Sequence, residues 1–258
     1  MKRVLLLHDI SESERIGMLE RGSRYLLSLR TIKTGIAEAQ SRKVKFDCID
    51  TVQDELSPER DYVSITVDDG GGSSVHLGEY FANEGIRAYF FIVSQFIGKN
   101  GFLEIGEIRA LHAMGHTIGA HSHTHPNPFC ELSREQTNEE VRKSKLVLEE
   151  ILGDEVDSFS VPGGNVRKET LRRLQDCRLG LKEVYTSTPF QGDYAGSSNT
   201  RVYGRVCIEA NMSAHKIARF CQGSGWSSAL INYQVRRLRR ELIYRMSNKG
   251  NAAANKKN

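Results

Sequence analysis

Hydrophobic and polar positions alternate in blocks along this chain, and the blocks predict strands and helices in turn. Short apolar runs, typical of buried strands, lie at 4–7, 62–65, 87–93, 117–120, 158–161, 184–187 and 205–209. Longer segments between them carry apolar residues every three or four positions, which indicates amphipathic helices. A repeated succession of strands and crossover-length helices predicts the α/β class with a parallel sheet.

The sequence marks the ends of some helices more clearly than others. Ser133 and Gln136 form the pattern of a capping box, and Gly153 follows the last apolar position of that helix. An earlier helix is expected over 15–39, with an interruption near Gly35. Further helices are expected at 73–83, 104–114 and 167–177 and from 213 onwards, and a polar loop at 191–199.

Length and composition suit one domain. With 258 residues, 39% of them hydrophobic, and 23 glycines, the chain has the apolar content of a globular α/β domain. We assign this domain to 1–248, with an N-terminal strand and helix at 1–60, a core at 61–212 and a basic C-terminal helix at 213–248. The polar residues 249–258 are expected to be a disordered tail.

The charge pattern excludes some partners. The net charge of +4 is spread over mixed acidic and basic residues, so nucleic acid is not expected as a partner. The apolar run at 4–7 is shorter than the roughly 7–15 residues of a signal peptide, and no run reaches the roughly 20 residues of a membrane span. We therefore expect a cytoplasmic protein without a transmembrane segment. A solvated face and contact with an anionic surface are the two explanations for the basic cluster Arg236, Arg237, Arg239 and Arg240.

Two polar clusters follow predicted strands and carry metal-binding side chains. The first is T-V-D-D-G at 66–70, and the second is H-S-H-T-H-P at 121–126. In sheets built by strand-helix alternation, sites are assembled at the carboxyl ends of the strands. Two carboxylates at one strand end and three imidazoles at another are therefore placed to share one metal ion.

Spacing alone leaves the ligand set open. On a helical turn His121 and His125 share a face, whereas in an extended segment His121, His123 and His125 share one. Asp68 and Asp69 point to opposite sides of a strand, so they are expected to have different roles, which the spacing does not assign. An Asp-Asp-Gly alone is commonly a turn, but both clusters together favour a metal. One carboxylate with two imidazoles is typical of catalytic sites, with the second carboxylate as a base for metal-bound water.

In this order, these residues resemble the motifs of the polysaccharide deacetylase family, also called NodB-homology or carbohydrate esterase family four. The cluster at 66–70 is similar to the family's T-F-D-D-G, and that at 121–126 to its H-S/T-x-x-H-P. The segments at 87–93 and 116–120 are similar to its A-T-F-F-I strand and its G-H-x-I-G segment, and the resemblance spans about 4–187. It implies a distorted (β/α) barrel of about seven parallel strands.

The resemblance also implies an activity and roles for individual residues. Family members remove acetyl groups from N-acetylated sugars, so the expected substrate is an acetylated sugar, oligosaccharide or glycan precursor. By position, Asp68 corresponds to the base, and Asp69, His121 and His125 to the ligands of a divalent ion. Zn²⁺ is expected there, with Co²⁺, Mn²⁺ and Ni²⁺ as alternatives. His123 then neighbours the site without being a ligand.

The chain departs from the family at its third motif, R-x-P-Y, which falls on 160–163. Pro162 is kept, and Gly163 retains a backbone N–H that can donate to an oxyanion. Ser160 replaces the arginine that holds the base in the family. This replacement predicts that Asp68 has lost a fixed positive partner.

The fifth motif departs as well, because its proton-donating histidine has no counterpart in the strand at 205–209. Arg205 is expected to assist electrostatically, although arginine is a poor proton donor. His8 belongs to a segment that resembles the family's opening Y-H-x, and it either borders the site or packs at the strand end. These losses support an alternative function, a catalytically impaired metal-binding barrel that binds glycans or regulates a partner.

Overall fold

A computed structural model describes residues 2–48, 62–164, 166–190, 193–195 and 199–239. Its strands are short and lie between residues 2 and 207. They are β1 (Lys2–Leu7), β2 (Lys45–Phe46), β3 (Tyr62–Val67), β4 (Tyr89–Ile92), β5 (Thr117–Ala120), β6 (Ser158–Ser160), β7 (Glu183–Tyr185), β8 (Asp193–Ala195), β9 (Arg201–Tyr203) and β10 (Val206–Cys207).

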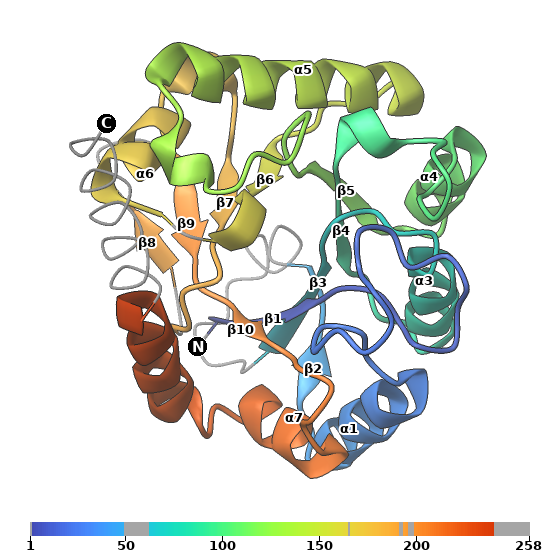
Figure 1. Ribbon diagram of the computed structural model, residues 1–258. Coiled ribbons are helices and arrows are strands. Elements are labelled where there is room, and N and C mark those ends of the chain that lie inside the picture. The colour runs from blue at the N-terminus through green and yellow to red at the C-terminus, as the bar shows by residue number, and fades with distance from the viewer. Residues whose placement is uncertain (1, 49–61, 165, 191–192, 196–198, 240–258) are drawn as a thin grey trace, which may run out of the picture.

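The strands form one curved sheet in the order β10-β1-β3-β4-β5-β6-β7-β9-β8, with β2 added beside β3. Every pairing is parallel except that between β8 and β9. Figure 1 shows the strands around the centre of the molecule and the helices outside them. The expected distorted (β/α) barrel is confirmed, although the sheet has ten strands because short strands join its ends and edge.

Helices connect the strands and cover the outer face of the barrel (Figure 1). They are α1 (Leu29–Ser41), α3 (Ser74–Asn83), α4 (Ile105–Ala113), α5 (Arg134–Leu152), α6 (Lys168–Leu174) and α7 (Ala214–Cys221), and residues 226–239 are also helical. The capping box of α5 is confirmed, since the Ser133 hydroxyl accepts from Gln136 N–H and the Gln136 side chain accepts from Ser133 N–H. None of the described helices is long and apolar enough to cross a membrane.

The strands separate two sets of packed side chains. Phe90 and Ile92 belong to the large apolar cluster that the helices cover, whereas Tyr89 and Phe91 belong to a smaller, aromatic cluster with Tyr185 and Tyr203. Neighbouring residues on a strand point to opposite faces, so the aromatic cluster fills the inside of the barrel. The guanidinium of Arg205 lies over two of these rings, 5.9 Å from the centroid of Phe91 and 6.0 Å from that of Tyr185.

The N-terminal region differs from the expectation. The helix expected over 15–39 begins only at Leu29, because residues 11–28 form turns, with positive φ at Gly17 and Gly22. Gly35 does not interrupt this helix, and a Cβ there would lie 2.9 Å from the Cβ of Ile217 in α7. Glycine therefore serves close helix packing at this position.

The polar loop expected at 191–199 also differs, because part of it forms the edge strand β8, which pairs with β9. The polar composition of this segment does not predict a strand, because an antiparallel hairpin at a sheet edge needs no apolar face of its own. The tail expected at 249–258 and the residues 49–61 lie outside the described part of the chain.

Candidate functional site

Sharp turns at two strand ends bring the predicted clusters together. β3 and β5 lie on either side of β4, and the two clusters follow their carboxyl ends. Asp69, Ser122 and His125 have left-handed backbone conformations, with φ of 78°, 65° and 58°. Such conformations are uncommon outside glycine and concentrate at functional sites. Here they turn side chains from two loops toward one point.

Asp69, His121 and His125 converge on that point. Asp69 Oδ1 lies 3.3 Å from His121 Nε2 and 3.6 Å from His125 Nε2. One ligand atom from each residue lies within 4.8 Å of the others. His121 Nδ1–H donates to the carbonyl of Ser160 at 2.8 Å, which orients the ring with Nε2 toward Asp69. A carboxylate oxygen, two imidazole nitrogens and a supporting carbonyl fit the chemistry of a divalent metal site.

His123 points away from this centre, and its orientation decides between the two ligand sets that spacing left open. Its Nδ1 lies 2.8 Å from the hydroxyl of Ser94, and its backbone N–H donates to Glu140. The left-handed residues on either side break the extended pattern that would place three imidazoles on one side. The pair His121 and His125 remains for the centre.

Asp68 lies beside this centre and is held by Arg205. Arg205 Nη1 donates to Asp68 Oδ1 and Nη2 to Oδ2, both at 2.8 Å, and Arg205 is fully buried. Arg205 also donates to the Thr66 hydroxyl and the Thr186 carbonyl, and Ser160 Oγ donates to Asp68 Oδ2 at 2.9 Å. The expectation that Asp68 has lost its positive partner was therefore wrong. The guanidinium comes from a different strand end.

Burial and nearby charges both shift the pKa values of the site residues. Burial alone raises the pKa of Asp68, but Arg205 and then His121 outweigh it and hold the pKa below its usual value. Burial, with repulsion from His121, lowers the pKa of His125 to about 4. Among the protein's own charges, Asp68 is thus a carboxylate and His125 a neutral imidazole at neutral pH, the forms that a base and a metal ligand require.

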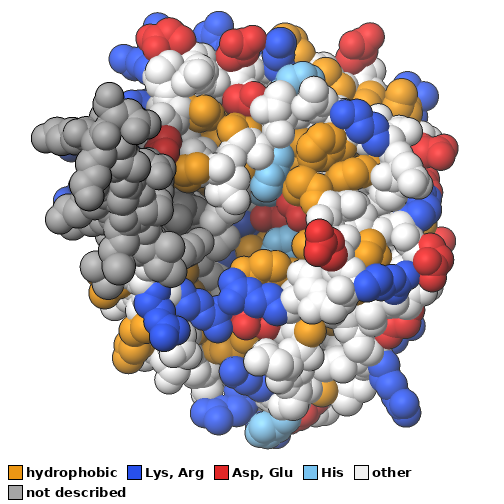
Figure 2. Space-filling view, viewed as in Figure 1, with side chains coloured by type: hydrophobic (Ala, Val, Ile, Leu, Met, Phe, Trp, Pro, Cys, Tyr) orange, Lys and Arg blue, Asp and Glu red, His pale blue; other side chains and the backbone are white. Residues whose placement is uncertain are grey.

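A cavity of about 620 Å³ opens above these residues. The space-filling view shows acidic and histidine side chains at the bottom of a central hollow (Figure 2). Gly163, with φ of 63°, lines the cavity. Ser160 and Pro162 are buried beside it rather than in its lining, and Ser160 acts through its bonds to Asp68.

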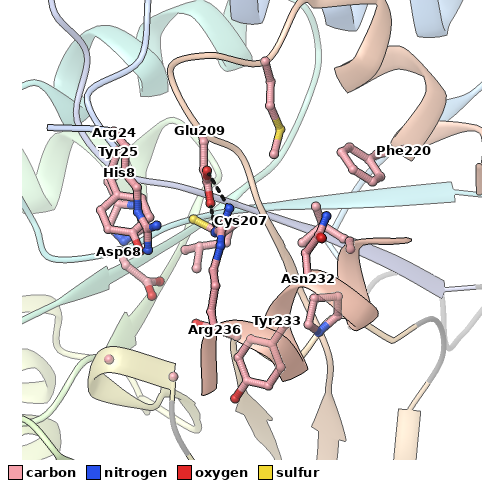
Figure 3. A pocket seen from close by; sticks show the side chains of 18 of the residues that line it. His8, Arg24, Tyr25, Asp68, Cys207, Glu209, Phe220, Asn232, Tyr233 and Arg236 are labelled. Atoms are coloured by element: carbon pink, nitrogen blue, oxygen red, sulfur yellow. Dashed lines mark hydrogen bonds and ion pairs between the residues drawn. The ribbon is translucent and has the colours of Figure 1, made fainter. Parts of the chain in front are cut away.

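His8 borders the cavity, in agreement with the first of its two expected placements. Its ring lies against Tyr25 at a centroid distance of 5.0 Å, and the close-up in Figure 3 shows both rings near Asp68. Its Nδ1 is buried without a hydrogen-bond partner among the described residues. Burial lowers the pKa of His8, so the ring is neutral at neutral pH.

Sequence reasoning missed the other half of the cavity. It is lined by residues of the turns before α1, of α7 and of the helix at 226–239, including Tyr25, Asn232 and Tyr233. These residues belong to no motif, and the last helix was interpreted only as a charged surface helix. Apolar spacing does not reveal this wall, because Ile231, Val235 and Leu238 of the last helix are exposed, whereas Asn232 and Tyr233 line the cavity.

A parallel barrel with an Asp-His-His centre at its strand ends, and a buried carboxylate beside that centre, defines the class of barrel hydrolases with a metal-type site. The chain belongs to the polysaccharide deacetylase family, whose model matches residues 55–182. Membership in this family of carbohydrate deacetylases confirms the resemblance of its motifs.

Solved structures share the fold at low sequence identity. A polysaccharide deacetylase from Bacillus cereus is 17% identical, with a TM-score of 0.71 over 85% of this chain and 68% of that one. The deacetylase PplD of Streptococcus pyogenes, solved with acetate, is 16% identical, with a TM-score of 0.71 over 85% and 97%. IcaB from Ammonifex degensii is 21% identical, with a TM-score of 0.70 over 86% and 97%.

Proposed function

We propose that this protein is a metal-dependent hydrolase that removes N-acetyl groups from an acetylated sugar, oligosaccharide or glycan precursor. The observation that carries the proposal is the placement of Asp68, ionised and held by Arg205, in one cavity with Asp69, His121 and His125. Family membership supports carbohydrate deacetylation as the reaction class.

Asp69, His121 and His125 would hold the divalent ion. When bound, the ion would supply Lewis-acid polarisation of the acetamide carbonyl and a lower pKa for water at the site. The donor set suits Zn²⁺ and accommodates Co²⁺, Mn²⁺ or Ni²⁺.

The chain's own groups would orient the substrate and move a proton. Hydrolysis adds water across the amide C–N bond and yields acetate and a free amine. Asp68 would take a proton from the attacking water, with Arg205 and Ser160 holding its two oxygens in one orientation. The Arg205 guanidinium has no acceptor for a proton, so it orients Asp68 without taking part in the transfer. The Gly163 N–H would donate to the oxyanion as the carbonyl carbon becomes tetrahedral.

Acetate release from a panel of N-acetylated oligosaccharides, with each candidate metal, tests this proposal. Turnover by the wild type should require the metal. The Asp68→Asn variant should lose about 10²–10⁴-fold in kcat, the usual contribution of general acid-base catalysis, yet bind the metal with unchanged stoichiometry. If neither protein releases acetate and both behave identically, the binding-module alternative replaces the hydrolase.

A further inference from the structure

The cavity continues beyond the metal-type centre into a second half with a different chemistry. This half is walled by the turn before α1, by α7 and by the helix at 226–239. Figure 3 shows Asp68 on one side of the cavity and Phe220 and Asn232 on the other, with Glu209 between them. A ligand that fills the whole cavity thus extends from the acidic centre to a separate wall.

That wall is basic. Four cationic side chains line it, one from the turn, two from α7 and one from the last helix: Arg24, Lys216, Arg219 and Arg236. Figure 2 shows Lys and Arg side chains gathered on the side of the central hollow that lies over α7 in Figure 1. Because Asp68 is already neutralised by Arg205, the cations do not serve the acidic centre.

Two of the four cations have internal partners. Arg236 forms an ion pair with the buried carboxylate of Glu209, drawn as dashed lines in Figure 3. The Arg24 guanidinium lies over the ring of Tyr25, 4.6 Å from its centroid. Among the described residues, no carboxylate lies within ion-pair distance of Lys216 or Arg219, so the wall has positive charge that the described part of the fold does not use.

The helix dipole of α7 disfavours one of these two cations, Lys216, although it favours Arg219 in the last turn. Lys216 lies in the first turn of α7, where the helix dipole disfavours a cation. Arg219 follows three residues later on the same face, and like charges at that spacing repel each other. The opposite face of α7 is fixed in the core by Ala218 and Cys221. An anion bound in the cavity beside these two side chains would offset both the dipole cost at Lys216 and the repulsion between the two cations.

We propose that this basic wall binds a phosphate or diphosphate group attached to the acetylated sugar. The proposal rests on the proposed deacetylase function, because it assigns the substrate class of the same cavity. The aromatic rings of Tyr25, Phe220 and Tyr233 in this half provide an apolar surface for the part of the substrate between the anion and the acetyl group.

The test compares an anionic and a neutral substrate of the same sugar, UDP-N-acetylglucosamine and triacetylchitotriose. In Lys216→Glu and Arg219→Glu the ratio of kcat/KM for the first over the second should fall about tenfold or more, because each variant replaces attraction by repulsion. Arg172→Glu, a charge reversal at an exposed position of α6 outside the cavity, should keep the wild-type ratio. The wild-type preference should also weaken as salt rises, since the Debye length falls from about 30 Å at 0.01 M to about 8 Å at 0.15 M.

A lipid-linked substrate and a free sugar nucleotide share this chemistry, and a third substrate separates them. N-acetylglucosamine linked to a lipid diphosphate in neutral detergent micelles should be deacetylated faster than the nucleotide if the lipid is the natural carrier. The reverse order would identify the soluble carrier. Either order supports the basic wall as the anion site.

Binding measurements keep this inference separate from the proposed chemistry. Calorimetry with UDP-N-acetylglucosamine on Asp68→Asn protein does not depend on turnover, and adding Arg219→Glu should weaken the binding about tenfold. Equal binding by both proteins, or a substrate ratio that Lys216→Glu and Arg219→Glu leave at the wild-type value, overturns the anion site even if deacetylation is observed. If binding depends on these charges but no deacetylation is observed, only the proposed hydrolase activity is overturned.

Discussion

Arg205, directly before β10, and Asp68, directly after β3, form a two-point ion pair inside the barrel, with both N–O distances at 2.8 Å. β1 lies between these two strands in the sheet. The family motif would place the arginine at position 160, where this chain has Ser160. The positive charge has therefore changed its strand while its target has stayed in place, and Ser160 completes the network with a hydrogen bond to the same carboxylate.

Replacing Arg205 by methionine should abolish deacetylation and destabilise the fold. The substitution keeps much of the volume but leaves the Asp68 carboxylate buried without its cation, which costs about 3–5 kcal/mol. Without Arg205 the pKa of Asp68 should rise, so the acid limb of any residual pH-rate profile should move to higher pH. Urea unfolding and initial rates across pH measure both effects.

Arg205→Lys is the matched control because it keeps the charge and loses the planar fork. A lysine has one ammonium group and would reach only one carboxylate oxygen at a time. We expect intermediate stability and an intermediate shift of the acid limb. If methionine and lysine at this position leave the acid limb where the wild type has it, Arg205 does not set the ionisation of Asp68.

The sequence predicted the barrel and the two clusters, because buried parallel strands and strand-end motifs depend on local patterns. It did not predict the partner of Asp68. Arg205 and Asp68 are 137 positions apart and meet only through the order of the strands, which local pattern does not encode. The sequence also did not predict that His123 points away from His121 and His125. This orientation depends on left-handed backbone conformations at Ser122 and His125, which the spacing and the following proline do not specify.

The histidines of the loop at 121–126 should differ in their contribution to the affinity for Zn²⁺. His121→Ala removes a ligand of the centre and should lower Zn²⁺ affinity by at least about tenfold, the loss typical even for an outer-shell change. His123→Ala should keep the wild-type affinity, because its ring bonds to Ser94 outside the centre. Competition titration with a chromogenic chelator gives both constants. An equal loss in the two variants would contradict the Asp69-His121-His125 assignment.

A methyl group at Gly119 should weaken the strand that carries His121. A Cβ there would lie 2.4 Å from a ring carbon of Phe91 and 2.6 Å from the Ser158 hydroxyl. Overpacking of this kind costs about 1–3 kcal/mol, so Gly119→Ala should lower the unfolding midpoint. Gly106→Ala in α4 is the control, since nothing lies near its Cβ and alanine favours a helix by up to about 1 kcal/mol. Equal stability of the two variants would contradict the close packing at β5.

Asp9 should make stability fall as pH rises toward neutrality. Burial raises the pKa of its carboxyl to about 7, although the Ser73 hydroxyl donates to it. The folded state therefore holds a proton that the unfolded chain releases near the ordinary value of 3.8, and stability present below that pH is lost as pH rises through about 7. The loss is on the order of 4 kcal/mol at most.

Asp9→Asn should remove this dependence, because an amide has no proton to lose. Its unfolding midpoint in urea should exceed that of the wild type at pH 8 and approach it at pH 5. Glu150→Gln, at an exposed position of α5, controls for the loss of one carboxylate. Parallel stability curves for wild type and Asp9→Asn would show that Asp9 titrates normally.

The position of the arginine can be tested by exchanging it with its neighbour in the network. Ser160 Oγ and Arg205 Nη2 both contact Asp68 Oδ2 and lie 2.9 Å from each other, so exchanging the two residues conserves volume and charge around the carboxylate. Ser160→Arg combined with Arg205→Ser should recover at least about tenfold of the kcat/KM lost in Arg205→Ser alone, since restored pairing of a buried carboxylate offsets well over 1.4 kcal/mol. Ser160→Arg in the wild-type background should instead be destabilised, because two guanidinium groups then compete for one carboxylate. A double variant no more active than Arg205→Ser would mean that Arg205 acts through its strand position rather than through its charge on Asp68.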